Sequence, residues 1–176
     1  MITSHKNLDE YLDIVDENDN VIGRDIRENI YTKNLGHRVR VINILVVNSE
    51  GKLLLPKKIN NAKYYPGCFD FSCGGHVESG EDYAHAAIRE LEEELGINDS
   101  KLIELGKLTP KDGVSCFMKV YKLVYDNKIE DYDKIEIEKL CWFDLQEVQQ
   151  LIIKDKTKFK GDFLIVLDWY IENYRK

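Results

Sequence analysis

Short apolar segments separated by polar turns dominate the first third of the chain. The apolar positions of residues 12–26 predict two short strands around a polar turn at residues 17–20. The next segment, residues 27–36, fits either a short helix or an irregular connection. Apolar residues then fill most positions of 39–47, which predicts a strand buried on both faces, with a turn at 48–51 and a second strand after it.

An amphipathic helix is predicted in the middle of the chain, after an aromatic-rich turn and a strand that ends in two adjacent glycines. Ser79 stands where a helix N-cap is expected, with Asp82 three residues later, as in a capping box. Gly96 predicts the end of this helix, because glycine adopts the left-handed conformation readily. The apolar stripe at helical spacing consists of Ala84, Ala87, Ile88, Leu91 and Leu95.

The remainder of the chain predicts three further strands and two amphipathic helices. The strands fall within residues 101–109, 114–125 and 135–145, and the helices within 145–152 and 163–174. Mixed strands with few helices between them predict the α/β class, with a mixed β-sheet sandwiched between helices. Because no repeat or linker interrupts this pattern, we expect a single domain over residues 1–176.

The composition of the chain limits the binding partners and the cellular location that we expect for it. A net charge of -7 and a pI of about 5.2 disfavour nucleic acid and anionic membrane as partners. The apolar run INILVV is far shorter than the roughly 20 residues of a membrane span, and the N-terminal segment does not resemble a signal peptide. We therefore expect a cytoplasmic protein, monomer or homodimer, whose four cysteines are free thiols.

Acidic residues are concentrated on the central helix in a way that surface charge pairing does not explain. Residues 75–97 hold seven acidic side chains and one arginine, Arg89. At about 100° per residue, Glu90, Glu93 and Glu94 share one flank of the helix. They lie toward its C-terminal end, where the helix dipole disfavours anions. A solvated helix face is the alternative, but carboxylate oxygens so grouped predict a site for Mg²⁺ or Mn²⁺.

The same stretch resembles the Nudix box, in which a glycine, a glutamate, Arg-Glu, Glu-Glu and a final glycine recur at fixed spacing. The resemblance implies a Nudix-type α/β/α sandwich that hydrolyses the pyrophosphate linkage of a nucleoside diphosphate joined to another group, or of a related phosphorylated small molecule. The matching positions, with no mismatch, are Gly75, Glu81, Arg89, Glu90, Leu91, Glu93, Glu94, Gly96 and Ile97.

The resemblance also implies a role for each box residue. Glu90, Glu93 and Glu94 would ligate Mg²⁺ or Mn²⁺, with the backbone carbonyl of Gly75, or of Gly74 before it, as a further ligand. Arg89 would orient Glu81 and the acidic cluster through charge-assisted hydrogen bonds.

The residue that activates the attacking water is left open by the resemblance. Either Glu93 or Glu94 would position that water. In some family members the base lies on a distant loop, and here Glu136 and Glu138 are the candidates, although both also fit exposed charges on a strand.

Side chains outside the box are candidates for substrate binding. Aromatic rings before the box could stack on a base, although core packing is the alternative, and two lysines at a strand end could meet phosphates or simply face solvent. These candidates are Lys57, Lys58, Tyr65, Phe69 and Phe71, with Tyr64 beside them. The sequence does not distinguish among a nucleoside triphosphate, a nucleotide sugar, ADP-ribose and a dinucleoside polyphosphate.

The first half of the chain also resembles the Nudix subgroup related to isopentenyl diphosphate isomerase, which is the main alternative. That isomerase uses a cysteine and a glutamate beside a metal held by three histidines and two glutamates. His37 and His76 match two of these histidines, but no histidine stands near Tyr31, where the third is expected. Cys73 is shifted by one residue, which turns a strand side chain to the opposite face. The intact box favours a hydrolase, and a non-catalytic module that binds Ca²⁺ or a protein is the third alternative.

Overall fold

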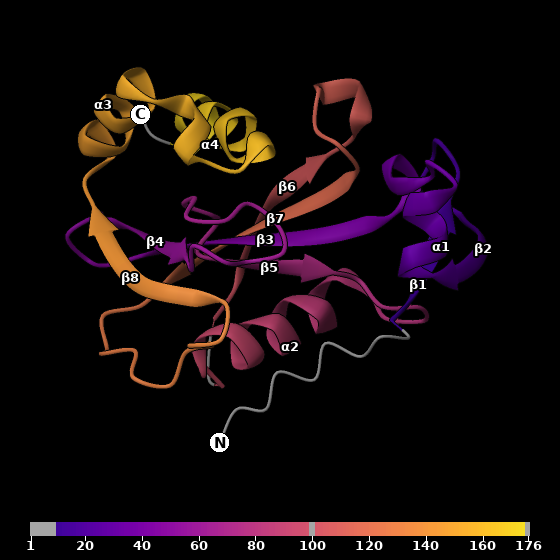
Figure 1. Ribbon diagram of the computed structural model, residues 1–176, viewed down its shortest axis with the longest axis horizontal. Helices are drawn as coiled ribbons and strands as arrows, with labels where there is room; N and C mark the ends of the chain where they lie inside the picture. The colour runs from indigo at the N-terminus through magenta and orange to yellow at the C-terminus, as the bar shows by residue number, and fades with distance from the viewer. Residues whose placement is uncertain (1–9, 99–100, 175–176) are drawn as a thin grey trace.

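A computed structural model describes residues 10–98 and 101–174 as a mixed β-sheet with helices on both faces (Figure 1). Helix α2 (Tyr83–Leu95) covers one face, and α3 (Leu145–Lys154) and α4 (Gly161–Tyr174) cover the other. The predicted α/β sandwich is therefore confirmed. The sheet contains β3 (Arg40–Val47), β4 (Leu53–Lys58), β5 (Cys73–His76), β6 (Ile103–Leu108), β7 (Phe117–Val124) and β8 (Ile137–Phe143).

Strand β3 is the central strand, and the sheet divides beside it. On one side β3 pairs in parallel with β7 over its whole length. On the other side it pairs with β5 at residues 41–44, but with β4 only where Val47 faces Leu53. Strands β4 and β5 therefore diverge from a common neighbour, and we call the place where they part the fork. The outer strands follow in the order β6-β7-β3-β4-β8.

Alternate side chains of β3 belong to two separate cores, as predicted for a strand buried on both faces. Leu45 and Val47 pack in the cluster formed with α3 and α4. Ile42, Ile44 and Val46 pack in the cluster formed with α2. This division fixes the register of β3, because a slip by one residue would exchange the two sets.

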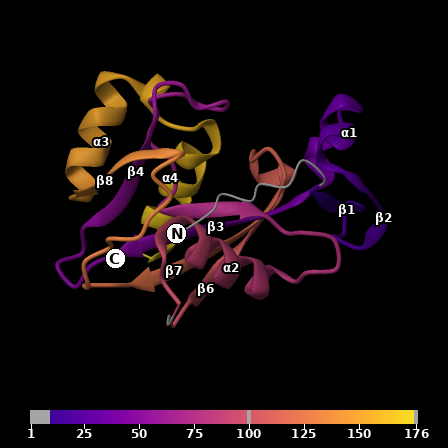
Figure 2. The same ribbon diagram turned by 60° about the horizontal axis from the view of Figure 1, so that its bottom comes forward.

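A hairpin of β1 (Tyr11–Val15) and β2 (Val21–Ile26), followed by α1 (Arg27–Thr32), lies at the end of the molecule away from α3 (Figure 2). Its turn residue Asp19 accepts from Arg40 at 2.6 Å and from Tyr83 at 3.0 Å, and also pairs with Lys107. Strand β1 supplies Asp13, which accepts from the Ser79 hydroxyl at 2.7 Å and the Gly80 N–H at 3.2 Å. The hairpin therefore anchors the loop that leads into α2.

Two features of α2 differ from the prediction. The N-cap is Asp82, whose side chain accepts from the His85 N–H, because the Ser79 hydroxyl is engaged by Asp13 instead. Ala84 and Ile88 of the predicted stripe are exposed, Ile88 to 49%, whereas Ala86 and Glu90 are buried, so the buried face is rotated toward β5. The predicted end at Gly96 is confirmed, with φ of 65°.

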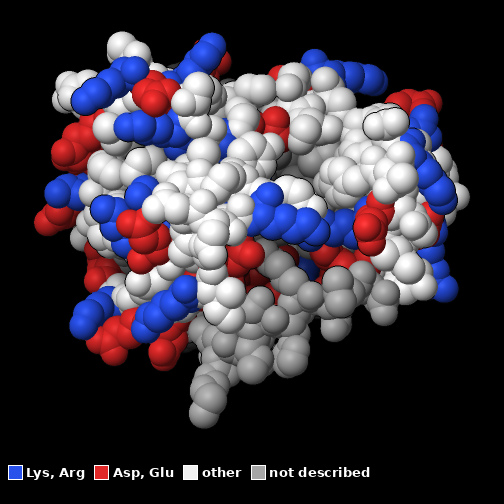
Figure 3. Space-filling model, in the orientation of Figure 1, with Lys and Arg blue, Asp and Glu red and all other residues white. Residues whose placement is uncertain are grey.

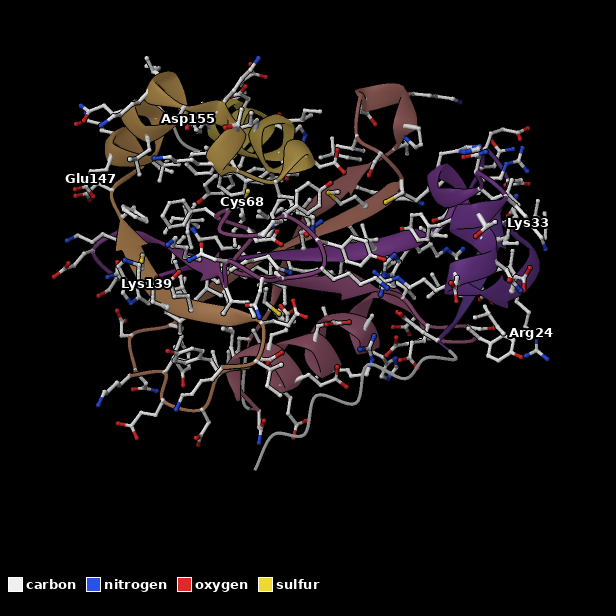
Figure 4. The ribbon with its side chains drawn as sticks, in the orientation of Figure 1. Arg24, Lys33, Cys68, Lys139, Glu147 and Asp155 are labelled. Atoms are coloured by element: carbon white, nitrogen blue, oxygen red, sulfur yellow. The ribbon has the colours of Figure 1, made fainter. Side chains whose placement is uncertain are left out.

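Three further features concern the helices, the charged surface and the cysteines of the described residues. Within residues 10–98 and 101–174, the helices are all too short or too polar to cross a bilayer. Lys, Arg, Asp and Glu side chains are interspersed on the face shown in Figure 3. The four cysteines are free, and Cys68 lies between the sheet and the helical layer of α3 and α4 (Figure 4).

Candidate active site

Arg89 is the centre of the predicted site. Its guanidinium donates to both carboxylate oxygens of Glu81, at 3.1 and 3.0 Å, and to Glu90 Oε1 at 2.8 Å. It also donates to the His76 carbonyl at 2.9 Å and to Glu93 at 3.3 Å. Burial alone would lower the pKa of Arg89, but the carboxylates of Glu81 and Glu90 raise it above its ordinary value. One charged side chain thus connects β5, the loop between β5 and α2, and the α2 residues Glu90 and Glu93.

Glu90 is a buried carboxyl group that fits against a glycine. It is 7% exposed, and a Cβ on Gly75 would stand only 2.0 Å from Glu90 Oε1. Burial raises the pKa of Glu90 to about 8, the charge of Glu94 adds to the rise, and Arg89 opposes it. A carboxyl group in such surroundings is stabilised by a proton or by a cation.

Glu94 and Glu93 are adjacent in sequence but differ in their surroundings. Glu94 Oε2 accepts from the backbone N–H of Gly74 at 3.0 Å, so this side chain reaches from α2 to β5. The Glu93 side chain is 58% exposed and contacts Arg89 at the rim of the cluster. The three predicted ligands therefore range from the buried Glu90 to the solvent-facing Glu93.

The carboxylates suit a hard divalent ion, although they do not form a closed cage. Among the described residues, no three His, Cys, Asp or Glu side chains are arranged around a common metal position. The reason is that Arg89 holds Glu90 and Glu93 while the Gly74 N–H holds Glu94. Mg²⁺ keeps several waters and binds through one or two carboxylates plus substrate phosphates, so it needs no closed cage. A buried carboxyl group in a glycine-lined cradle fits such an ion.

The two lysines predicted to meet phosphate are engaged in ion pairs at the end of β4. Lys57 Nζ lies 2.8 Å from a carboxylate oxygen of Glu138, and Lys58 Nζ lies 3.1 Å from one of Glu136. These partners are the two carboxylates considered as a distant base. The hydrogen bond from Lys57 lowers the pKa of Glu138, which makes it a weaker base. A substrate role for either lysine stays a prediction.

The aromatic candidates divide into core and surface residues. Phe71 is 2% exposed and packs edge-on against Phe163, so its burial does not support contact with a substrate. Phe69 packs on Phe143 and Phe159 in the same core. Tyr65 is 48% exposed and lies in the loop before the box, with a positive φ of 52°. Of the three, Tyr65 remains a candidate for substrate contact.

A network around His76 was not predicted from the sequence. The Tyr31 hydroxyl lies 2.9 Å from His76 Nε2, and His76 Nδ1 lies 3.6 Å from Glu10 Oε1. Arg27 Nη1 is paired with Glu10 at 2.9 Å. A signal was present, since the resemblance to the isomerase subgroup implies a third histidine near Ile30 and Tyr31. In the structure the Tyr31 hydroxyl faces His76.

Replacing Gly75 by alanine is expected to lower kcat at least about tenfold, because the added methyl group must displace the Glu90 carboxylate. The matched control is Gly23→Ala, since a Cβ on Gly23 would meet nothing within 4 Å. Steady-state kinetics of both variants, with circular dichroism to verify folding, make the comparison. Equal turnover of Gly75→Ala and the unmodified protein would contradict the importance of the cradle.

Comparison with known proteins identifies the family. Residues 36–165 match the model of the NUDIX domain. The chain is 42% identical over 168 residues to an uncharacterized Nudix hydrolase of Nostoc sp., covering 93% of this chain and 97% of the relative. A crystal structure of a Deinococcus radiodurans protein matches with a TM-score of 0.84 and 31% identity, covering 94% of this chain and 100% of the other. The chain therefore belongs to the Nudix family, which confirms the predicted family, its fold and its class as a Nudix hydrolase.

An isomerase relative also matches. The chain is 29% identical over 166 residues to an isopentenyl-diphosphate Delta-isomerase of Serratia proteamaculans, covering 91% of this chain and 90% of the relative. The Cys73 thiol is fully buried in the core against α2, and burial followed by the charges of Glu94 and Glu90 raises its pKa well above the ordinary value. A thiol in this position is poorly suited to exchange protons with a substrate.

Proposed function

We propose that this Nudix protein is a divalent-metal-dependent hydrolase that cleaves the pyrophosphate linkage of a nucleoside diphosphate joined to another group, or of a related phosphorylated small molecule. The observation that carries the proposal is the convergence of the box side chains on Arg89, with Glu90 held against Gly75. These groups place negative charge where a divalent ion could bind and be shared with the phosphate oxygens of a diphosphate. A nucleotide substrate, a cytoplasmic location and a single domain over residues 1–176 belong to the same proposal.

Each side chain has a distinct task in this proposal. Mg²⁺ or Mn²⁺, when bound, would neutralise charge on the phosphate oxygens and lower the pKa of a water molecule. Glu90, Glu93, Glu94 and the Gly75 carbonyl would hold the ion. Arg89 keeps the glutamates oriented.

In this proposal the proton acceptor for the attacking water is a glutamate of α2. Glu93 is exposed enough to meet a water molecule directly, and Glu94 is the alternative. The ion pairs of Glu136 with Lys58 and of Glu138 with Lys57 favour the box glutamates over these two distant carboxylates. The hydrogen bond from Lys57 lowers the pKa of Glu138, and the pair with Lys58 occupies Glu136.

A substrate panel tests the proposed function. Nucleoside triphosphates, nucleotide sugars, ADP-ribose and dinucleoside polyphosphates are incubated with Mg²⁺, with Mn²⁺ and with EDTA, and phosphate is measured with and without a coupled phosphatase. We expect metal-dependent hydrolysis of at least one class. Absence of hydrolysis with either metal, together with conversion of isopentenyl diphosphate without phosphate release, would replace the hydrolase assignment by the isomerase one.

A further inference from the structure

Lys160 is brought to the fork by main-chain pairing rather than by a helix or a named strand. The segment before α4 runs beside residues 68–70, where the Phe69 N–H donates to the Lys158 carbonyl at 2.7 Å and the Lys160 N–H donates to the Phe69 carbonyl at 3.1 Å. Residues 68–70 pair in turn with the end of β4. Cys68, labelled in Figure 4, marks this segment between the sheet and the helical layer. The backbone of Lys160 is therefore held beside residues 68–70, which lie between it and the end of β4.

The side chain of Lys160 contacts the segment that leads into β5. Its ammonium group lies 3.4 Å from Asp70 Oδ1 and 5.6 Å from the centre of the Phe71 ring. Burial alone would lower the pKa of Lys160, but the charge of Asp70 and then that of Glu94 raise it. Its partner Asp70 lies three residues before β5, where the Gly74 N–H donates to Glu94. The ammonium group is thus joined to the strand that contacts the box helix, and the Lys160 side chain stays 31% exposed.

The pair with Asp70 leaves this cation available. A charge-assisted N–H to carboxylate bond is usually about 2.7–2.9 Å long, so 3.4 Å is loose, and the same Oδ1 already accepts from the Phe71 N–H at 2.8 Å. Lys57, Lys58 and Arg89 each have a carboxylate oxygen at 3.1 Å or closer. Of these basic groups, Lys160 is the one that can change partner at least cost.

We propose that Lys160 binds the diphosphate of the substrate opposite Glu90 and Glu94, and that its ammonium group leaves Asp70 to do so. This inference rests on the proposed function and names a group that receives the phosphate oxygens. A lysine ammonium serves as a compact point charge for phosphate with three donors. The alternative is an ion pair that only fastens the segment before α4 to residues 68–70.

Three variants separate substrate binding from a fastening role. Lys160→Gln removes the charge, Lys160→Arg keeps it, and Asp70→Asn removes the partner alone. Lys158→Gln is the matched control, because Lys158 is an exposed lysine two residues away on the same segment. The probe is methylenediphosphonate with Mg²⁺, titrated by calorimetry, with thermal unfolding and steady-state kinetics measured in parallel.

For Lys160→Gln we expect probe affinity to fall by about tenfold or more and KM to rise similarly. Lys160→Arg should restore most of both, Asp70→Asn should bind the probe at least as well as the unmodified protein, and Lys158→Gln should be unchanged. Unaltered probe affinity in Lys160→Gln, or equal losses of thermal stability in Lys160→Gln and Asp70→Asn without an affinity change, would overturn the inference. Hydrolysis by the unmodified protein would still stand in that case, whereas its absence from the substrate panel refutes the proposed function itself.

Discussion

Replacing Glu94 by glutamine is expected to lower kcat by about a hundredfold or more while the fold stays intact. The glutamine carbonyl oxygen can still accept the hydrogen bond from the Gly74 N–H, so the contact between α2 and β5 survives. What is lost is one negative charge beside the buried Glu90, and with it part of the attraction for a divalent ion. The measurement is kcat at saturating Mg²⁺ and substrate, with Mn²⁺ affinity determined by calorimetry.

Glu92→Gln is the matched control for this variant. Glu92 is exposed on the other flank of α2, so the substitution removes the same charge from the same helix without touching the cluster. Its activity should stay within about twofold of the unmodified protein, since surface substitutions away from the site have small effects. If Glu92→Gln and Glu94→Gln lost activity equally, the net charge of the helix would matter and not the position of Glu94.

Glu90 is expected to make the metal-free protein less stable as pH rises. Its pKa is about 8 in the folded protein, against an ordinary value of 4.5. Between these pH values the unfolded carboxyl group has lost its proton while the folded one retains it, so the free energy of unfolding falls as pH increases. Above pH 8 the loss is complete. Glu90→Gln carries no ionisable proton and should therefore lose less stability over this range.

Thermal unfolding in EDTA at pH 5 and pH 9 measures this effect. The melting temperature of Glu90→Gln relative to the unmodified protein should rise by about 5 °C between the two pH values. Glu93→Gln provides the control, because the Glu93 side chain is 58% exposed. An identical pH dependence for Glu90→Gln and the unmodified protein would show that burial of Glu90 does not disfavour its charged form.

The elements that were predictable from sequence are those whose signal is local. The β3 segment shows its burial through consecutive apolar residues, and Gly96 ends α2 as its conformational freedom predicts. The start and buried face of α2 were less predictable because contacts distant in sequence decide them. The Ser79 hydroxyl donates to Asp13 and therefore does not cap α2. Glu90 turns inward because Gly75 has no side chain to exclude it.

In the candidate site, too, residues with a local sequence signal were predictable and residues brought together by distant contacts were not. Fixed spacing along one helix made Glu90, Glu93 and Glu94 recognisable, since helical geometry alone places them on one flank. Lys160 and Asp70 had no such signal, because they meet only through the pairing of two irregular segments. The burial of Phe71 was equally hidden, since an aromatic residue beside a motif fits a core as well as a binding surface.

The hairpin at the N-terminal end has a practical consequence for shortened versions of this chain. The matched family region begins at residue 36, yet Asp13 and Asp19 lie before it. A fragment trimmed to that region would leave Arg40 and Lys107 without the carboxylate they share, and the loop before α2 without its hydrogen bonds to Asp13. Expression boundaries taken from the family match alone would therefore remove contacts that hold the start of α2 in place.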